Sequence, residues 1–148
     1  MIAARPWLLA AAWMSIAASL LHLACIMGGP EWYRFLGAGE EMARAVERGS
    51  SVPALMTAAI AAIIAVWAAY AFGAAGTIRR LPLTRTALIA IAAVLLARAA
   101  LAFVPGVWAP EQTFGFRMWS SAIVLVLGLC FAIGTWKAWP SLAVRSRG

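Results

Sequence analysis

Long apolar runs alternate with short polar segments along this chain. Four runs of about 20 residues lie at Trp7 to Met27, Val52 to Ala75, Thr86 to Val104 and Met118 to Trp136. About 20 residues, each rising roughly 1.5 Å, cross the hydrocarbon core of a bilayer as a helix. The runs lack the alternating pattern of barrel strands, so each is predicted to be a transmembrane helix. The expected fold is all-α, an integral membrane four-helix bundle in a single domain.

Composition and charge support a membrane protein. The 148 residues are 65% hydrophobic and only 11% charged, with a mean hydropathy of +0.91, whereas soluble domains are about a quarter charged. The net charge of +7 would suit a nucleic-acid partner, but the basic residues stand in short clusters beside the apolar runs. That placement is typical of membrane orientation. We therefore expect membrane lipid as a partner and no nucleic acid.

The distribution of Lys and Arg predicts the orientation. Arg5, the connection 76–85 and the carboxyl tail carry basic residues without acidic ones, so these regions are expected in the cytoplasm. The first connection, 28–51, mixes four Glu with three Arg, and the third sets Glu111 against Arg117, so both are expected outside. Eleven Arg to one Lys, with no Asp or Asn, suggests a GC-rich bacterial genome. The predicted location is the bacterial cytoplasmic (inner) membrane, with both termini cytoplasmic.

An alternative to this topology is cleavage of the first span. The stretch ending "LHLAC" resembles a signal peptide with a lipoprotein-type Cys25. His22 occupies a position where such processing requires an apolar residue, and the apolar stretch is longer than usual for a signal. Sequencing of the mature N-terminus would separate the two, because a start at Cys25 leaves three spans.

The first connection contains two predicted helices. Pro30 and Glu31 suit a helix start, and the apolar residues that follow, Trp32, Phe35 and Leu36, share one face. Gly37 and Gly39 end this short interfacial segment. A second helix is predicted from Glu40 to Arg48, with a Glu40–Arg44 pair and a stop at Gly49. We expect the segment to cap the outer end of the bundle with its apolar side down; the alternative is a solvated loop with some helix.

Small residues and prolines mark the expected packing and ends. Small residues at four-residue spacing on span one and on span two favour close helix contacts; they are Ala11, Ser15 and Ser19, and Ala61, Ala65, Ala69 and Gly73. Pro53 fits the first turn of span two. Four prolines are expected at connections, outside the spans; they are Pro82, Pro105, Pro110 and Pro140.

Candidate chemistry within the spans centres on two residues. Arg98 is the only charged residue well inside a span, where an Arg costs roughly 2.5 to 3.5 kcal/mol on insertion scales. It lies six residues below the outer end of its span, about 9 Å down by the helical rise. His22 lies six residues below Gly28 in a span that runs in the same direction. The two residues are therefore predicted to lie at one depth.

Further polar residues are expected to converge on this pair in an outward-facing pocket. The spans contain no Asp or Glu, so a carboxylate partner for Arg98 must come from a connection, or else the partner is an anionic ligand or a lipid headgroup. The candidate ligand-binding residues are His22, Arg98, Ser19, Glu31, Glu40, Glu41, Arg117 and Ser120. The alternative is that Arg98 snorkels outward and His22 bonds a neighbouring helix.

Two functions remain open at this stage. The favoured one is a binding or transport module that holds a small amphipathic or anionic ligand or a lipid, assembled as a homo-oligomer because four spans enclose little volume. The other is a membrane enzyme that uses His22 and a loop glutamate as acid and base on a lipid-like substrate. No metal site and no cofactor are expected, since one His offers too few ligands and haem would need His22 from two copies. Cys25 and Cys130 are predicted to be buried free thiols.

Overall fold

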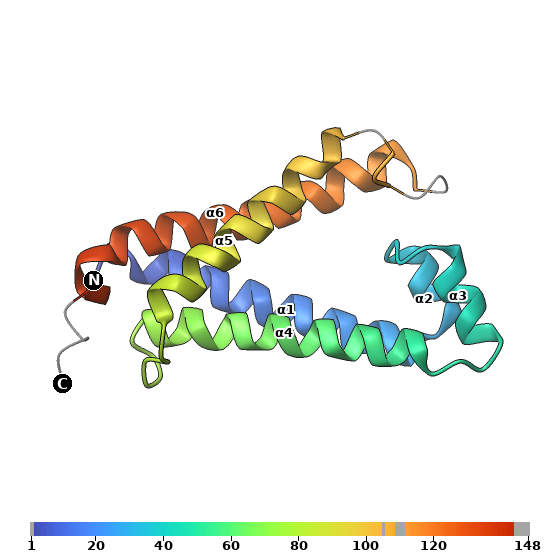
Figure 1. Ribbon diagram of the computed structural model, residues 1–148, viewed down its shortest axis with the longest axis horizontal. Coiled ribbons are helices and arrows are strands. Elements are labelled where there is room, and N and C mark those ends of the chain that lie inside the picture. Colours follow the sequence, from blue (N-terminus) through green and yellow to red (C-terminus); the bar gives the residue numbers. More distant parts are fainter. Residues whose placement is uncertain (1, 105, 109–111, 144–148) are drawn as a thin grey trace.

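The protein is an all-α bundle built on four long helices (Figure 1). The computed structural model describes residues 2–104, 106–108 and 112–143. The long helices are α1 (Arg5–Gly28), α4 (Val52–Ala74), α5 (Thr84–Ala100) and α6 (Phe114–Ala143). A 3₁₀ turn, η1 (Leu101–Phe103), continues α5. The predicted fold class is confirmed, and each of the four helical segments is long and apolar enough to span a membrane.

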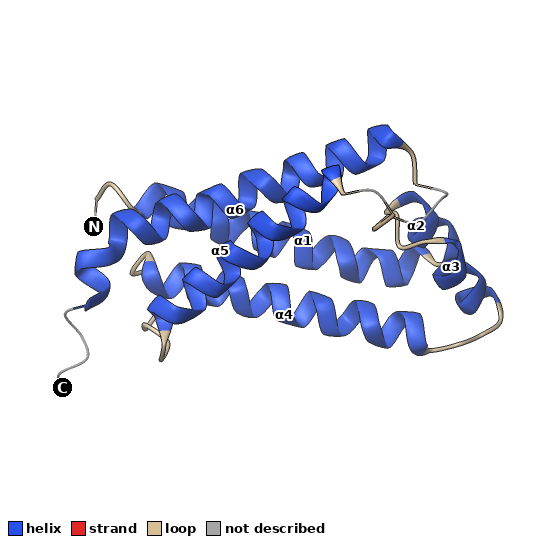
Figure 2. Cartoon of the chain, turned by 45° about the horizontal axis from the view of Figure 1, so that its top comes forward, coloured by secondary structure: helices blue, strands red, loops and turns tan. Residues whose placement is uncertain are grey.

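Two short helices connect α1 to α4 at one end of the bundle. They are α2 (Pro30–Phe35) and α3 (Glu40–Glu47), and the segment 30–48 that contains both is called the hairpin below. The predicted breaks are confirmed, because Gly37 and Gly39 have φ angles of 74° and 97° and separate the two helices. Figures 1 and 2 show the hairpin folded across the ends of α1 and α4. We call this the hairpin end, and the opposite one, where α1 begins and α6 finishes, the terminal end.

The hairpin is docked on the bundle rather than extended from it. Tyr33, which is 1% exposed, packs with Cys25 of α1 and Ala43 of α3 in a small apolar cluster. Of the predicted apolar face, Leu36 packs against this cluster, whereas Trp32 and Phe35 are exposed. The buried aromatic residue is therefore Tyr33, and the contact supports a cap rather than a solvated loop.

The spans pack as two pairs of helices. Helices α1 and α4 are in close contact. The small residues Ala11, Ser15 and Ser19 of α1 are all buried. Ser19 donates a 2.8 Å hydrogen bond to the carbonyl of Ala61 in α4. The buried residues of α4 include Thr57, Ala61, Ala68, Ala71 and Gly73. Of the four small residues predicted to face another helix, Ala61 and Gly73 are therefore buried, whereas Ala65 and Ala69 are only partly buried.

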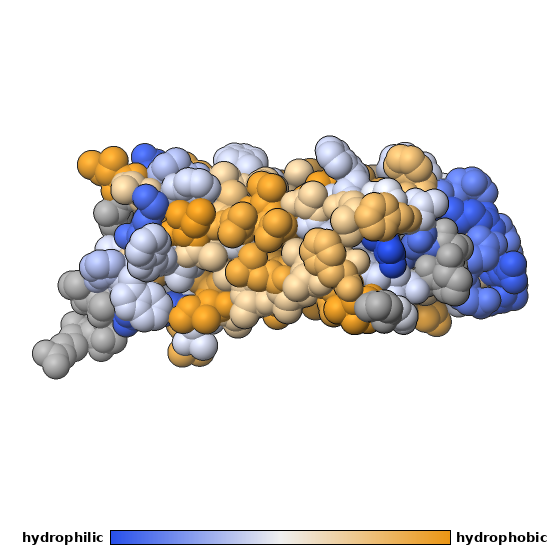
Figure 3. Space-filling model, turned by 90° about the horizontal axis from the view of Figure 1, so that it is seen from above, coloured by the Kyte–Doolittle hydropathy of each residue, from blue (hydrophilic) through white to orange (hydrophobic). Residues whose placement is uncertain are grey.

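The second pair is formed by α5 and α6. Gly128 of α6 lies against Leu95 and Leu96 of α5, and near the terminal end Gly134 of α6 lies against Leu8 of α1. The two pairs share a core there and diverge toward the hairpin end (Figure 1). Apolar side chains cover the middle of the molecule, and the hairpin end is strongly hydrophilic (Figure 3). This distribution is the one expected of a membrane-spanning bundle.

The fourth span corrects one expectation. Pro140 was expected at a connection, but α6 runs from Phe114 to Ala143 and contains it. Proline removes one backbone donor and clashes with the carbonyl four residues before it, so it is costly in the middle of a helix. Here it stands in the last turn, where only three more residues follow it in the helix. The length of the apolar run predicted a span from Met118 to Trp136, so it placed the start of the helix too late and its end too early.

Candidate binding site

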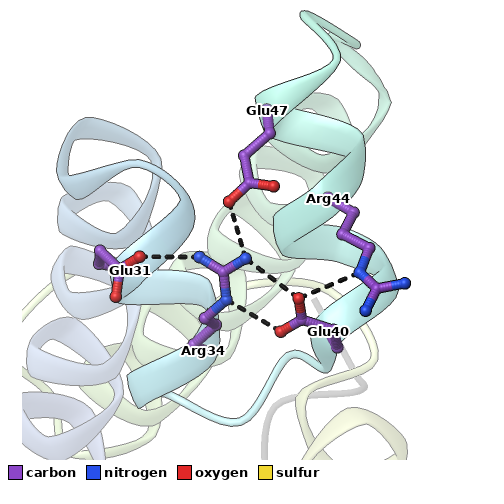
Figure 4. Close-up of polar contacts among 5 residues, drawn as sticks. All are labelled: Glu31, Arg34, Glu40, Arg44 and Glu47. Atoms are coloured by element: carbon purple, nitrogen blue, oxygen red, sulfur yellow. Dashed lines mark hydrogen bonds and ion pairs between the residues drawn. The ribbon is translucent and has the colours of Figure 1, made fainter.

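The hairpin holds a network of charged side chains around Arg34 (Figure 4). Its guanidinium contacts Glu31 at 2.7 Å, Glu40 at 2.9 Å and Glu47 at 2.7 Å. Glu40 is shared, because Arg44 also donates to it at 3.1 Å. The predicted Glu40–Arg44 pair is thus confirmed, and Arg34 is the residue that joins α2 to α3.

The ion pairs of the network shift the pKa values of its members. Hydrogen bonds from Arg34 and then Arg44 lower the pKa of Glu40 to about 2, from an ordinary 4.5. The same contacts, first with Glu40 and then with Glu47, raise the pKa of Arg34. Glu31 and Glu40, expected as partners of Arg98, are therefore engaged within the hairpin. Glu41 is exposed at the start of α3, and Glu111 lies outside the described residues.

A pocket lies between the hairpin and the start of α6. It has a volume of about 310 Å³ and is lined by Arg34, Gly37, Gly39, Glu40, Gln112, Thr113 and Phe116. The side-chain amide of Gln112 donates to the carbonyl of Gly37, and the ring of Phe116 packs against the same glycine. Of the predicted site residues, only Glu40 lines this pocket, and it is already ion-paired. The one arginine among the lining residues, Arg34, is already ion-paired with Glu40.

Arg98 lies on the other helix pair and has different neighbours. It donates to the hydroxyl of Ser121 at 3.4 Å, and its guanidinium carbon stands 4.3 Å from the ring centroid of Trp108. The indole N–H of Trp108 donates to the carbonyl of Leu101 at 2.8 Å, which holds the ring over the end of α5. Within residues 2–104, 106–108 and 112–143, no carboxylate pairs with Arg98. Among these described residues, the Arg98 charge is stabilised by the ring face of Trp108 and the hydroxyl of Ser121.

Ser121 also lines an apolar groove between α5 and α6. The groove has a volume of about 420 Å³, and its walls are Leu96, Ala99, Ala100, Ala102, Phe103, Met118, Ser121, Ala122 and Leu125. A hydroxyl that contacts both Arg98 and this groove places a cationic group beside an apolar surface. Such an arrangement suits a molecule with an anionic head and an apolar tail.

The structure does not bring His22 and Arg98 together. Helices α1 and α5 do not pack against each other in the described part of the chain, since α1 pairs with α4 and α5 with α6. The imidazole Nδ1 of His22 is 2.7 Å from the carbonyl of Ala18 on its own helix. Ser19, a second candidate, is used in the contact with Ala61. This arrangement corrects the expectation that the polar groups of α1 and α5 meet in one pocket.

The candidates at the start of α6 also serve local contacts. Ser120 donates to the carbonyl of Arg117 at 3.3 Å, and the Arg117 guanidinium lies 5.7 Å from the ring of Phe114. Sequence reasoning missed Arg34, although its spacing of three from Glu31 on a short helix was a signal. Trp108 follows the third apolar run, and nothing in the sequence indicates that its ring covers Arg98.

Comparisons with known proteins were made at three levels. No protein-family model, no curated protein and no solved structure matches this chain. The environment of Arg98 is therefore the most informative indication of function in this chain.

Proposed function

We propose that this protein is a binding module in the bacterial cytoplasmic membrane that holds a small amphipathic anion through Arg98. The observation that carries the proposal is a guanidinium within a span that, among the described residues, meets Ser121 and Trp108 and no carboxylate. The groove lined by Ser121 supplies the apolar surface for the rest of the ligand. A lipid headgroup and a free amphiphile share this chemistry.

The energetics favour an anionic ligand over an empty site. Arg98 lies in the last turn of α5, so it costs less than the roughly 2.5 to 3.5 kcal/mol that insertion scales give for an Arg at the centre of a span. Intramembrane Arg residues still face protein or water and pair there. Ser121 is a neutral acceptor, and a ring face supplies about 0.5 to 2 kcal/mol. A bound phosphate or carboxylate would add charge-assisted hydrogen bonds, which are roughly twice as strong as neutral ones. The site is therefore better satisfied when an anion is bound.

We propose the orientation on the basis of charge. The terminal end carries Arg5, Arg79, Arg80 and Lys137, and no acidic residue lies near these positions in the sequence. Because positively charged connections stay in the cytoplasm, the terminal end faces inward and the hairpin end outward. Arg98 then lies in the outer half of the bundle. A homo-oligomer would enclose the groove between copies, and transport of the ligand is an extension of the same proposal. For the enzyme alternative, with His22 and a glutamate, residues 2–104, 106–108 and 112–143 provide no contact between the two.

The test is binding of a matched pair of amphiphiles. Purified protein in a neutral detergent is incubated with dodecyl phosphate or dodecanol, and bound copies are counted by native mass spectrometry. We expect the wild type to retain dodecyl phosphate and not dodecanol. Arg98→Ala should weaken retention about 10- to 100-fold, the loss expected for a hydrogen bond to a charged group. Arg98→Lys should retain part of the affinity, because a lysine keeps the charge without the planar fork.

A control variant distinguishes the loss of the Arg98 contact from a general decrease in the positive charge of the protein. Arg48→Ala removes one positive charge from the exposed end of the hairpin and should leave retention unchanged. Ser121→Ala keeps the guanidinium and should weaken retention less than Arg98→Ala. Equal retention by the wild type and Arg98→Ala would overturn the proposal, and so would equal losses in Arg98→Ala and Arg48→Ala.

A further inference from the structure

A second groove lies between α5 and α6 toward the terminal end. It has a volume of about 620 Å³ and is lined by Ile89, Ala92, Ala93, Leu96, Ala132, Thr135, Trp136 and Trp139. The residues of α5 that line the groove include Ile89, Ala93 and Leu96. Their spacing of three and four residues places them on one face of the helix. From Ile89 to Leu96 the helix rises about 10 Å, which is most of the roughly 15 Å depth of one hydrocarbon leaflet.

Arg85 stands at the open end of this groove. It precedes Ile89 by one helical turn on the same face of α5, and its guanidinium carbon lies 3.7 Å from the ring centroid of Trp139, a wall residue. The Nε of Arg85 is buried and has no hydrogen-bond partner among the described residues. The stacked ring holds the guanidinium in place and leaves its Nε without an acceptor among the described residues. A positively charged donor group therefore marks one end of an apolar channel.

The charge of the surrounding surface has one sign. Arg79 and Arg80 precede Arg85 in the same connection, and Lys137 lies between the two tryptophans of the groove. Arg80 donates to the carbonyl of Ser141 at 3.1 Å, which joins this connection to the end of α6. The acidic residues of the chain all lie between 31 and 47 or at 111. An occupant with negative charge is favoured at this end.

We propose that this groove binds one acyl chain of an anionic phospholipid whose phosphate is held by Arg85. The walls belong to two membrane-spanning helices, so the occupant must come from the bilayer, and the groove length suits one chain of a single leaflet. Basic pockets between spans bind anionic headgroups through the same physics of charge and stacked guanidinium. This groove lies toward the end opposite the hairpin and adjoins the groove beside Arg98 at Leu96, which lines both. Its headgroup contact, Arg85, is a different residue from Arg98, and the proposed function does not need it.

Lipid retention tests the site. The protein is extracted from bilayers of equal parts phosphatidylglycerol and phosphatidylcholine, and the lipids that remain bound are counted by native mass spectrometry. The wild type should retain one phosphatidylglycerol in preference to phosphatidylcholine. Arg85→Gln should lower that retention about 10-fold, the size expected for one lost charge-assisted contact. Arg79→Gln removes the same charge from an exposed residue at the same end and should lower retention far less, because Arg79 adds only to the general charge of this end.

A steric variant keeps the test decisive if Arg85→Gln folds poorly. Ala93→Phe fills the groove while leaving Arg85 intact, and Ala90→Phe adds the same ring on an exposed face of α5 outside the groove. Ala93→Phe should release the lipid and Ala90→Phe should not. Unchanged phosphatidylglycerol retention in Arg85→Gln or in Ala93→Phe would overturn the proposal, as would equal losses in the Arg79 and Arg85 variants. Dodecyl phosphate binding at Arg98 is unaffected by either result.

Discussion

Three arginines of this protein illustrate two kinds of environment, ion-paired and stacked on a tryptophan ring. Arg34 is surrounded by carboxylates on the hairpin, Arg98 lies over Trp108, and Arg85 lies over Trp139. A guanidinium is planar and weakly hydrated, so it stacks on aromatic faces where a lysine ammonium would keep its water. Of these three arginines, the two stacked on tryptophan lie near apolar grooves, and the ion-paired one lies in the polar hairpin. The same side chain is structural in one place and available for anions in the others.

The pairing of Arg34 predicts an unusual titration of Glu40. The native pKa of this carboxyl is about 2, below its ordinary 4.5, so the ionised form is the one that the fold favours. Its pairing therefore stabilises the hairpin fully above about pH 4.5, and this contribution is lost as the pH falls toward 2. Carbon-13 NMR titration of the Glu40 carboxyl in micelles measures the midpoint directly.

Two variants distinguish the effect of the Arg34–Glu40 ion pair on the Glu40 pKa from the effect of the general positive charge. Arg34→Gln should raise the midpoint of Glu40 by about 1 unit or more, the usual effect of a neighbouring cation. Arg48→Gln should leave the midpoint of Glu40 in place, because the groups that lower its pKa are Arg34 and Arg44. A wild-type midpoint near 4.5 would show that the network does not form in micelles.

At the scale of the elements, residue spacing predicted local contacts well. The line of Ala11, Ser15 and Ser19 predicted the buried face of α1, and the Glu40–Arg44 spacing predicted an ion pair. The longer-range contacts of Arg34 with Glu40 and Glu47 were not predictable, because they depend on how the glycine turn sets α3 against α2. Pro140 shows the same limit, since a proline in a last turn looks like a connection in the sequence.

Because α1 and α4 are in close contact, a bulky substitution on the face of α4 toward α1 should destabilise the protein more than one on its outer face. Ala61 is 2% exposed where Ser19 bonds its carbonyl, whereas its neighbour Ala62 points away from the bundle. Ala61→Leu adds bulk to a packed interface and should cost about 1 to 3 kcal/mol of unfolding free energy. Ala62→Leu adds the same atoms to the outer face and should change little. Unfolding in mixed micelles by increasing fractions of sodium dodecyl sulfate compares the two, and equal effects would contradict the assigned α1–α4 face.

At the scale of the whole molecule, equal depth did not place two residues together. His22 and Arg98 were predicted at one height, and both lie toward the hairpin end of their helices. Height along a helix says nothing about which helices pair or which face a residue occupies. Abundant alanine offers close-packing faces on every span, so the sequence did not decide between the pairings. The observed pairs, α1 with α4 and α5 with α6, diverge where the predicted pocket would be (Figure 1).

The arrangement of the two ends predicts which connections are accessible from each side of a membrane. The hairpin and the connection between α4 and α5 lie at opposite ends of the bundle, and Arg48 and Arg79 are exposed residues in each (Figure 1). In a protein with both native cysteines replaced, Arg48→Cys should react with an impermeant maleimide in intact bacterial cells. Arg79→Cys should react only after the cells are permeabilised, because basic connections stay in the cytoplasm. Reaction of both cysteines in intact cells would contradict the fold itself, since the two ends could not then lie across one bilayer. Reaction of Arg79→Cys alone would keep the fold and reverse the proposed orientation, which would place Arg98 in the cytoplasmic half of the bundle and the groove at Arg85 in the outer leaflet.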